Sequence, residues 1–334
     1  MDPLSRLRNN KRVNGFFLCL IIVHLVASVL VSILAMGAVE IGTFTALLLT
    51  QLLLLVPSFI FILTDKEDVP GRLRFRRLKV GTVLLVILFT FLMMPLISLI
   101  NVVSQLFTTN AAAELSGEFI GMPAVLTVFM VGMFGPFCEE FAFRGIIFGG
   151  FRRSGAVLAG AVLSSVYFGI MHLNLNQMSY AIILGVVFCL LVEGTGSIWA
   201  SITAHVVVNT WNVFLLLFMD KLYDSMGLDI FELAEEAVTT DQKLAMTGYL
   251  LVGSLISSAI ALGVFIVICR NEDRWDDVVS MFCKTADTKT ADMETADAEI
   301  KDTKVRLLTL SGYIAIALCI FIIFFLDRVL EMFV

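Results

Sequence analysis

Residues 42–63, GTFTALLLTQLLLLVPSFIFIL, do not contain a single charged side chain. A helix rises about 1.5 Å per residue, so a run of this length can cross a hydrocarbon core roughly 30 Å thick. The rest of the chain has the same character. Of its 334 residues, 59% are apolar and 16% charged, against about 45–50% and roughly 25% in soluble domains. The sequence therefore predicts an integral membrane protein.

Nine apolar segments predict an all-α fold, a polytopic transmembrane helical bundle with about nine membrane-spanning helices. The predicted spans are 13–36, 42–63, 80–107, 122–150, 155–172, 178–193, 197–219, 247–269 and 307–326. The first is longer than the apolar region of a signal peptide, so we interpret it as an uncleaved anchor. The fourth contains Gly135-Pro136, which predicts a break or kink in its helix.

The distribution of Lys and Arg predicts the orientation of the spans. When nine spans alternate in direction, all but three of the 23 Lys and Arg residues fall on the same side as the N-terminus. The exceptions are Lys221, Lys243 and Arg328. Because positive residues concentrate in cytoplasmic loops, we expect a multi-pass plasma-membrane protein with a cytoplasmic N-terminus and an extracellular C-terminus.

Loops of different composition divide the chain into four parts. Residues 1–121 hold three N-terminal spans with a basic cytoplasmic loop at 64–79, and residues 122–219 hold a core of four spans. Residues 220–246 form an acidic outer segment that can hold a helix at the membrane surface. Residues 247–334 hold the C-terminal spans and a low-complexity cytoplasmic linker, 271–305, with three Thr-Ala-Asp repeats. Such a polar stretch cannot bury a core, so we expect it to be mobile.

Composition also argues against several classes of protein. Five of the six cysteines lie in apolar runs and none forms a Cys-x-x-Cys pair, which disfavours a disulfide framework and a zinc ribbon. No basic stripe with interleaved aromatic residues indicates binding to nucleic acid.

Charged side chains inside the fourth span mark a candidate site. A charge at the centre of a membrane helix costs roughly 2.5–3.5 kcal/mol, so such residues are functional candidates. Glu140 and Arg144 are four residues apart and can pair, whereas Glu139 has no local partner. A lone carboxylate in apolar surroundings suits a general base, and a helix restarting after Pro136 would favour its charge. The alternative is an ion pair that only locks two helices together.

Two further pairs lie one helical turn apart in later spans. Phe168 and His172 share a face, where an imidazole can hold a water molecule or shuttle a proton; the alternative is a hydrogen-bonded core histidine. His205 and Asn209 can together donate two hydrogen bonds to an oxyanion; the alternative is hydrogen bonding between helices. With Glu139, these groups can support attack of water on a peptide bond. Counted along straight helices, His172 lies deeper than the others.

The three motifs, in this order, resemble those of the CPBP family, the CAAX prenyl protease and bacteriocin-processing intramembrane proteases, also called the Abi family. The family pattern is Glu-Glu-x-x-x-Arg, then Phe-x-x-x-His, then His-x-x-x-Asn or Asp, and the matching region covers about 122–215. The resemblance implies a membrane-embedded protease like the type II CAAX prenyl endopeptidases.

The resemblance also assigns roles to residues. Glu139 would activate water with His172, and His205 and Asn209 would stabilise the oxyanion. Glu140, Arg144 and Phe168 would be supporting residues. Members of the family are often called metalloproteases; if a divalent metal such as zinc is bound, Glu139, His172 and His205 are its candidate ligands. Their spacing is not a recognisable zinc pattern, so we expect no obligatory metal.

The leading hypothesis is an intramembrane endopeptidase that hydrolyses a peptide bond with water activated by glutamate and histidine. Its expected partners are the lipid bilayer and a peptide or protein substrate, lipid-modified or not, without nucleic acid. One alternative is a non-catalytic membrane scaffold or bacteriocin immunity protein. Another is a small-solute or proton-coupled transporter, since buried Glu and His also build proton relays. Against a transporter, no internal repeat relates two halves of the sequence.

Overall fold

A computed structural model describes residues 2–36, 41–65, 69–108, 117–228, 239–287 and 306–331. Within these ranges the chain is helical and contains no strand, as the apolar runs predicted. The elements, with η marking π-helical turns, are α1 (Pro3–Met36), α2 (Thr43–Thr64), α3 (Val69–Leu73), α4 (Val80–Ser104), α6 (Ala124–Thr127), η1 (Val128–Phe134), α7 (Gly135–Glu140), η2 (Phe141–Phe148), α8 (Gly149–Arg153), α9 (Val157–Ile170), α10 (Leu175–Thr195), α11 (Ile198–Ser225), α13 (Thr240–Asn271), α14 (Trp275–Asp287) and α15 (Leu310–Glu331).

Among the described residues, seven helical segments are long and apolar enough to cross a membrane. They are α1, α2, α4, the continuous run from α6 to α8, α10, α11 and α13. The two other predicted spans correspond to shorter apolar helices, α9 and the Leu310–Phe325 part of α15. The 14 residues of α9 extend over only about 21 Å, so this helix does not cross a bilayer core by itself. The polytopic helical bundle is thus confirmed.

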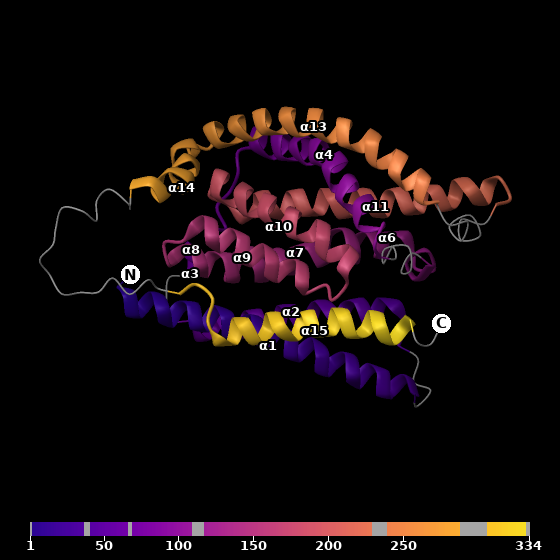
Figure 1. The fold of residues 1–334 in the computed structure, drawn as a ribbon, viewed down its shortest axis with the longest axis horizontal. Helices are drawn as coiled ribbons and strands as arrows, with labels where there is room; N and C mark the ends of the chain where they lie inside the picture. The colour runs from indigo at the N-terminus through magenta and orange to yellow at the C-terminus, as the bar shows by residue number, and fades with distance from the viewer. Residues whose placement is uncertain are drawn as a thin grey trace, which may run out of the picture.

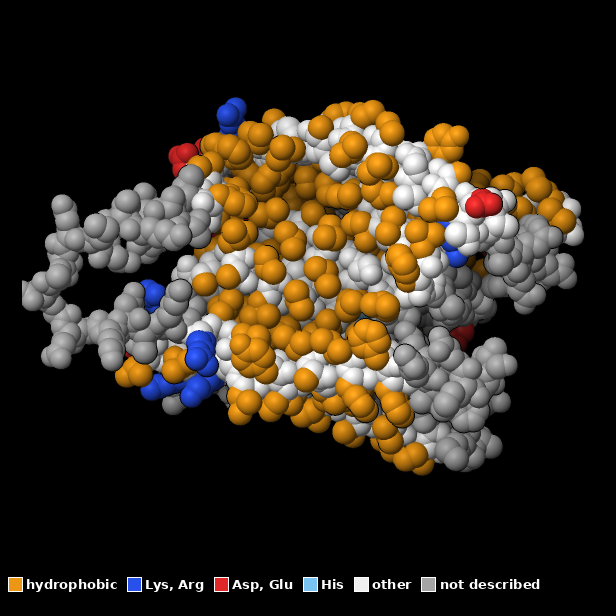
Figure 2. All heavy atoms as spheres, viewed as in Figure 1, with side chains coloured by type: hydrophobic (Ala, Val, Ile, Leu, Met, Phe, Trp, Pro, Cys, Tyr) orange, Lys and Arg blue, Asp and Glu red, His pale blue; other side chains and the backbone are white. Residues whose placement is uncertain are grey.

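The helices run side by side and form layers (Figure 1). The helices α1, α2 and α15 lie on one side of the bundle, α4 and α13 lie on the other, and the elements from η1 to α11 lie between them. Along their lengths α15 packs on α1 and α13 packs on α4. Figure 2 shows hydrophobic side chains over the middle of the visible face, with Lys and Arg toward its ends. This is the surface expected of a membrane-embedded bundle.

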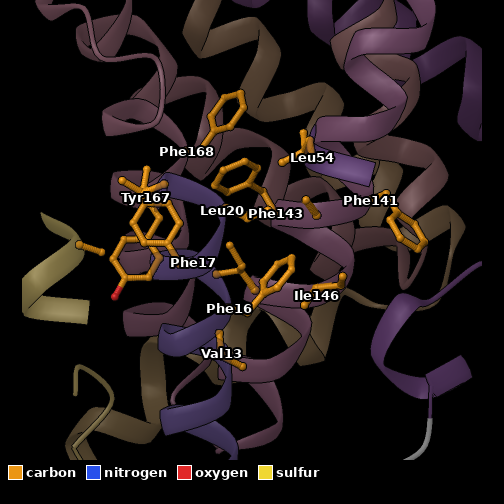
Figure 3. Packing of buried hydrophobic residues seen from close by; sticks show 14 of the residues in the cluster. Val13, Phe16, Phe17, Leu20, Leu54, Phe141, Phe143, Ile146, Tyr167 and Phe168 are labelled. Atoms are coloured by element: carbon orange, nitrogen blue, oxygen red, sulfur yellow. The ribbon is translucent and has the colours of Figure 1, made fainter. Parts of the chain in front are cut away.

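Two clusters of buried apolar side chains meet at the central helices. The first joins α1, α2, η2, α9 and α15, and includes Phe17, Phe143 and Phe168 (Figure 3). The second joins α4, α10, α11 and α13, and includes Phe188. Tyr180 packs against both clusters. Side chains at this junction are therefore enclosed from both sides.

A network of ion pairs fastens the loop 74–79 at the end of the bundle where α1 begins. Glu193, near the end of α10, pairs with Arg74 at 2.9 Å. Its Oε1 also lies 3.5 Å from Arg152 Nε, and its Oε2 lies 3.5 Å from Arg274 Nη2. Burial lowers the pKa of Arg74, and the charge of Glu193 opposes that shift. The basic loop predicted at 64–79 is thus tied to α10 and, through Glu193, to α8 and to Arg274 between α13 and α14.

The structure differs from the predicted elements in two places. The segment 271–305 contains the helix α14, because Val278 is buried in the second cluster and gives this polar stretch an apolar anchor. The repeats at 290–292 and 295–297 lie outside the described residues. In the predicted outer segment, 220–246, α11 continues to Ser225 and α13 already begins at Thr240.

Amide side chains of α1 hold the segment that leads into α15. Asn10 donates a hydrogen bond to the carbonyl of Arg306 at 3.1 Å, and Asn14 donates to the carbonyl of Leu307 at 3.0 Å. The hydroxyl of Tyr167 donates to Asn14. Gly312 lies at this contact, where any Cβ would collide with the side chains of Asn14 and Tyr167. The last described helix therefore depends on the first.

The close packing of α9 and α10 can be tested at Gly185. A Cβ on this residue would lie 2.9 Å from the Cα of Ser165. We expect Gly185→Val to lower the Tm in detergent by several degrees, because overpacking costs about 1–3 kcal/mol. Gly253→Val is the matched control, since nothing lies within 4 Å of a Cβ at that position. Equal losses of Tm in the two variants would contradict the predicted contact.

Candidate active site

The helix that carries Glu139 continues through Pro136. The backbone of Phe134 and Gly135 is right-handed helical, and the N–H of Gly135 bonds to the carbonyl of Met130 in a π-helical turn. The wider π turn accommodates the proline ring, which in a regular α-helix clashes with the carbonyl four residues earlier. The predicted break, with a new helix N-terminus near Glu139, is therefore wrong.

Pro136 instead fixes the neighbouring helix α11. It has no N–H for the carbonyls four and five residues earlier, Gly132 and Val131. Asn209 Nδ2 donates to the Val131 carbonyl at 3.2 Å, and Thr210 Oγ1 donates to the Gly132 carbonyl at 3.3 Å. Backbone carbonyls inside a membrane need such partners. Gly132 permits the approach, because a Cβ there would lie 2.7 Å from Thr210 Oγ1.

Glu140 is the centre of a buried charge cluster. Its Oε1 accepts a hydrogen bond from Arg144 Nη1 at 2.9 Å, the pairing that the four-residue spacing predicted. The same oxygen lies 2.9 Å from His205 Nδ1. With Glu140 ionised, this hydrogen bond requires a proton on Nδ1 and directs Nε2 of the imidazole toward Glu139. Glu140 thus has both a charge partner and an orienting role.

Glu139 has a different environment from its neighbour. Its Oε2 lies 3.7 Å from His205 Nε2, beyond hydrogen-bond distance. The Glu139 side chain is 25% exposed, whereas the Glu140 side chain is 0% exposed. Glu139 is therefore the carboxylate that a water molecule or a substrate can reach.

Two phenylalanine rings, one from each apolar cluster, enclose the charges. The Arg144 guanidinium carbon lies 4.2 Å from the ring centroid of Phe168 and 5.0 Å from that of Phe188. The centroid of the His205 ring lies 5.8 Å from that of Phe168 and 5.0 Å from that of Phe188. Such rings attract the cation and exclude water, which strengthens the electrostatic interactions of the cluster. Sequence reasoning missed Phe188, because no spacing relates it to the motifs.

His172 lies one helical turn beyond the charge cluster. Ser164 Oγ donates to the carbonyl of Phe143 at 3.1 Å, which brings Phe168 near the level of Glu139. The ring of His172 packs edge-on against Phe168 at 5.1 Å, and its Nδ1 lies 2.9 Å from the Phe168 carbonyl. The short helix α9 thus removes most of the depth difference counted along straight helices. Among the described side chains, no direct contact joins His172 to either glutamate.

The arrangement does not fit a zinc ligand set. In the described part of the chain, no group of three or more His, Cys, Asp or Glu side chains could hold a metal ion. A catalytic zinc usually takes three protein ligands. Of the three candidate ligands, Glu139 and His205 lie close together, and His172 and His205 each pack edge-on against the Phe168 ring.

Comparisons with known proteins match this part of the chain. Residues 121–211 match a family model described as Rce1-like, type II CAAX prenyl endopeptidase Rce1-like. Over 92 residues the chain is 35% identical to the protein named "Putative membrane peptidase YdiL" of Bacillus subtilis (strain 168). The alignment covers 28% of this chain and 38% of that relative. No solved structure matches the chain.

The different environments of the two glutamates predict different effects on stability. Arg144→Met leaves Glu140 buried without its cation, which we expect to cost about 3–5 kcal/mol of unfolding free energy. Glu139→Gln removes a partly exposed charge without a close partner, so we expect an unchanged or higher Tm. Thermal unfolding of both variants in the same detergent measures the difference. Similar losses in both would mean that Glu139 is a structural residue.

Proposed function

We propose that this chain is an intramembrane endopeptidase, because residues 121–211 match the Rce1-like model of type II CAAX prenyl endopeptidases. The observation that supports it best is the pairing pattern of the two glutamates. Glu140 is held through Oε1 by Arg144 and His205, and Glu139 remains accessible 3.7 Å from His205 Nε2. In this site one carboxylate orients the imidazole and the other stays accessible to water, an arrangement that suits general-base chemistry.

In the proposed reaction, Glu139 accepts a proton from a water molecule. With Nδ1 of His172 donating to the Phe168 carbonyl, Nε2 of the same ring is an acceptor that can orient that water. The water oxygen bonds to the carbonyl carbon of the scissile peptide, and the carbonyl oxygen takes the negative charge. The proton on Glu139 then passes to the leaving nitrogen, and the C–N bond breaks.

Two side chains of α11 would stabilise the oxyanion. One N–H of the Asn209 amide is held by the Val131 carbonyl, and the other remains for the substrate. His205, whose Nδ1 is held by Glu140, would donate through Nε2 in its doubly protonated form. Each such donor contributes about 10²–10³ in rate in enzymes with comparable oxyanion sites. No step of this scheme uses a metal.

Cleavage assays with substituted proteins test the proposal. The protein, reconstituted in liposomes, is given farnesylated CAAX peptides and unmodified hydrophobic peptides, and the products are identified by mass spectrometry. We expect Glu139→Gln, His172→Ala and Asn209→Ala each to reduce cleavage about 100-fold or more. Glu118→Gln, at an exposed position outside the cluster, is the control. We also expect cleavage to persist after treatment with EDTA.

Two results would overturn the proposal. Full activity of Glu139→Gln at normal expression would exclude its role as the base. Absence of cleavage, together with a lower Tm for Glu139→Gln, would favour a non-catalytic scaffold in which the cluster docks helices. Uptake of a small solute or protons into the same liposomes would favour a transporter.

The proposal includes a plasma-membrane location with a cytoplasmic N-terminus and an extracellular C-terminus. It is supported by the Lys and Arg distribution, and by α1 beginning and α15 ending at opposite ends of the bundle (Figure 1). Alkaline phosphatase folds only outside the cytoplasm, so a fusion after Val334 should be active and a fusion after Lys79 inactive. The reverse pattern would contradict the orientation.

A further inference from the structure

Gln51 places a carboxamide in the middle of the apolar helix α2. Its Oε1 is buried and accepts no hydrogen bond from any residue that the structure describes. The other polar side chains nearby are satisfied within the helix: Thr50 donates to the Ala46 carbonyl at 2.9 Å and Ser58 to the Leu54 carbonyl at 2.7 Å. An unpaired amide oxygen in a membrane interior costs free energy. Packing alone therefore does not account for Gln51.

The carboxamide of Gln51 lies against the helix that carries the proposed general base. The Cβ position of Gly135 is 3.5 Å from Gln51 Nε2 and 3.7 Å from Gln51 Cδ. Glu139 follows Gly135 by four residues, so both share one side of the helix. From α11, the amide of Asn209 reaches the same helix one turn earlier, at Val131. Carboxamides from two different helices thus lie on the turns that precede Glu139.

The spacing suits an extended peptide in front of Glu139. One helical turn separates Gly135 from Glu139, which is about 5.4 Å along the axis. An extended peptide advances about 3.3 Å per residue. A peptide whose scissile carbonyl faces Glu139 therefore brings a backbone N–H near Gln51 within about two residues of that bond.

We propose that Gln51 is a substrate-positioning residue: its Oε1 accepts a hydrogen bond from a backbone N–H of the peptide, within about two residues of the scissile bond. This inference rests on the peptidase activity proposed above. The interaction orients the peptide and holds it in register, and Gln51 exchanges no proton with the reacting atoms. It also explains why this buried acceptor has no partner among the residues that the structure describes.

The test uses Gln51→Met, which keeps the length of the side chain and removes its hydrogen-bonding atoms. The probe is a peptide that the wild-type protein cleaves, together with versions methylated at single backbone nitrogens near the cleaved bond. We expect Gln51→Met to raise KM about tenfold with little change in kcat. At one position, N-methylation should raise KM for the wild type but not for Gln51→Met, because both changes remove the same hydrogen bond.

Ser258→Ala is the matched control. Ser258 Oγ is also buried without a hydrogen-bond partner among the described residues, but it lies on α13, which packs chiefly on α4. We expect this variant to leave KM unchanged. Unchanged KM for Gln51→Met, or equal effects of N-methylation on both proteins, would overturn the inference while leaving the peptidase proposal intact. A lower Tm with unchanged KM would show that Gln51 is structural. Absence of any cleaved peptide would overturn both proposals.

Discussion

A fully buried carboxylate must keep its hydrogen-bond partners, and the centre of this molecule is built around that requirement at Glu140. Arg144 from the same helix and His205 from α11 meet one oxygen of Glu140, each at 2.9 Å. These contacts set the distance between the two helices and the orientation of the imidazole. The rings of Phe168 and Phe188 pack against the Arg144 guanidinium and exclude water from the ion pair. Glu139 lies beside this cluster with its side chain 25% exposed, whereas that of Glu140 is 0% exposed.

A second constraint holds α11 about one helical turn after His205, at Asn209 and Thr210. Pro136 supplies no N–H to the preceding turn, and Asn209 and Thr210 donate to two carbonyls of that turn. The helix α11 is thus attached to the central helix by a charged contact at His205 and by neutral contacts one turn later. Two attachments prevent rotation of α11 about its axis, so His205 and Asn209 keep the positions that the proposed chemistry needs.

Local rules predicted much of this arrangement. Each of the nine predicted apolar runs coincides with a helix or a continuous helical run among the described residues, and the four-residue spacing paired Glu140 with Arg144. Glu140 and His205 are 65 residues apart in the sequence. Their contact depends on how two helices pack, and the sequence carries no local signal for that packing. The sequence predicted a break at Pro136 because a proline in an apolar run looks the same whether the helix breaks there or continues through a π turn. Gln51 did stand out in the sequence as a carboxamide in an apolar run, but no second polar residue at helical spacing marked it as part of a site.

The attachment of α15 to α1 has a consequence for how the protein is made. Asn10 and Asn14 enter the membrane region with the first helix, but the carbonyls that accept from them lie 296 and 293 residues later in the chain. Chains fold from the N-terminus as they are synthesised. Asn14 also donates to the carbonyl of Asn10 within its own helix, but the contacts of both amides with the segment before α15 form only after nearly the whole chain has been translated. A chain that ends before residue 306 lacks both of these carbonyls and the helix α15 that packs on α1.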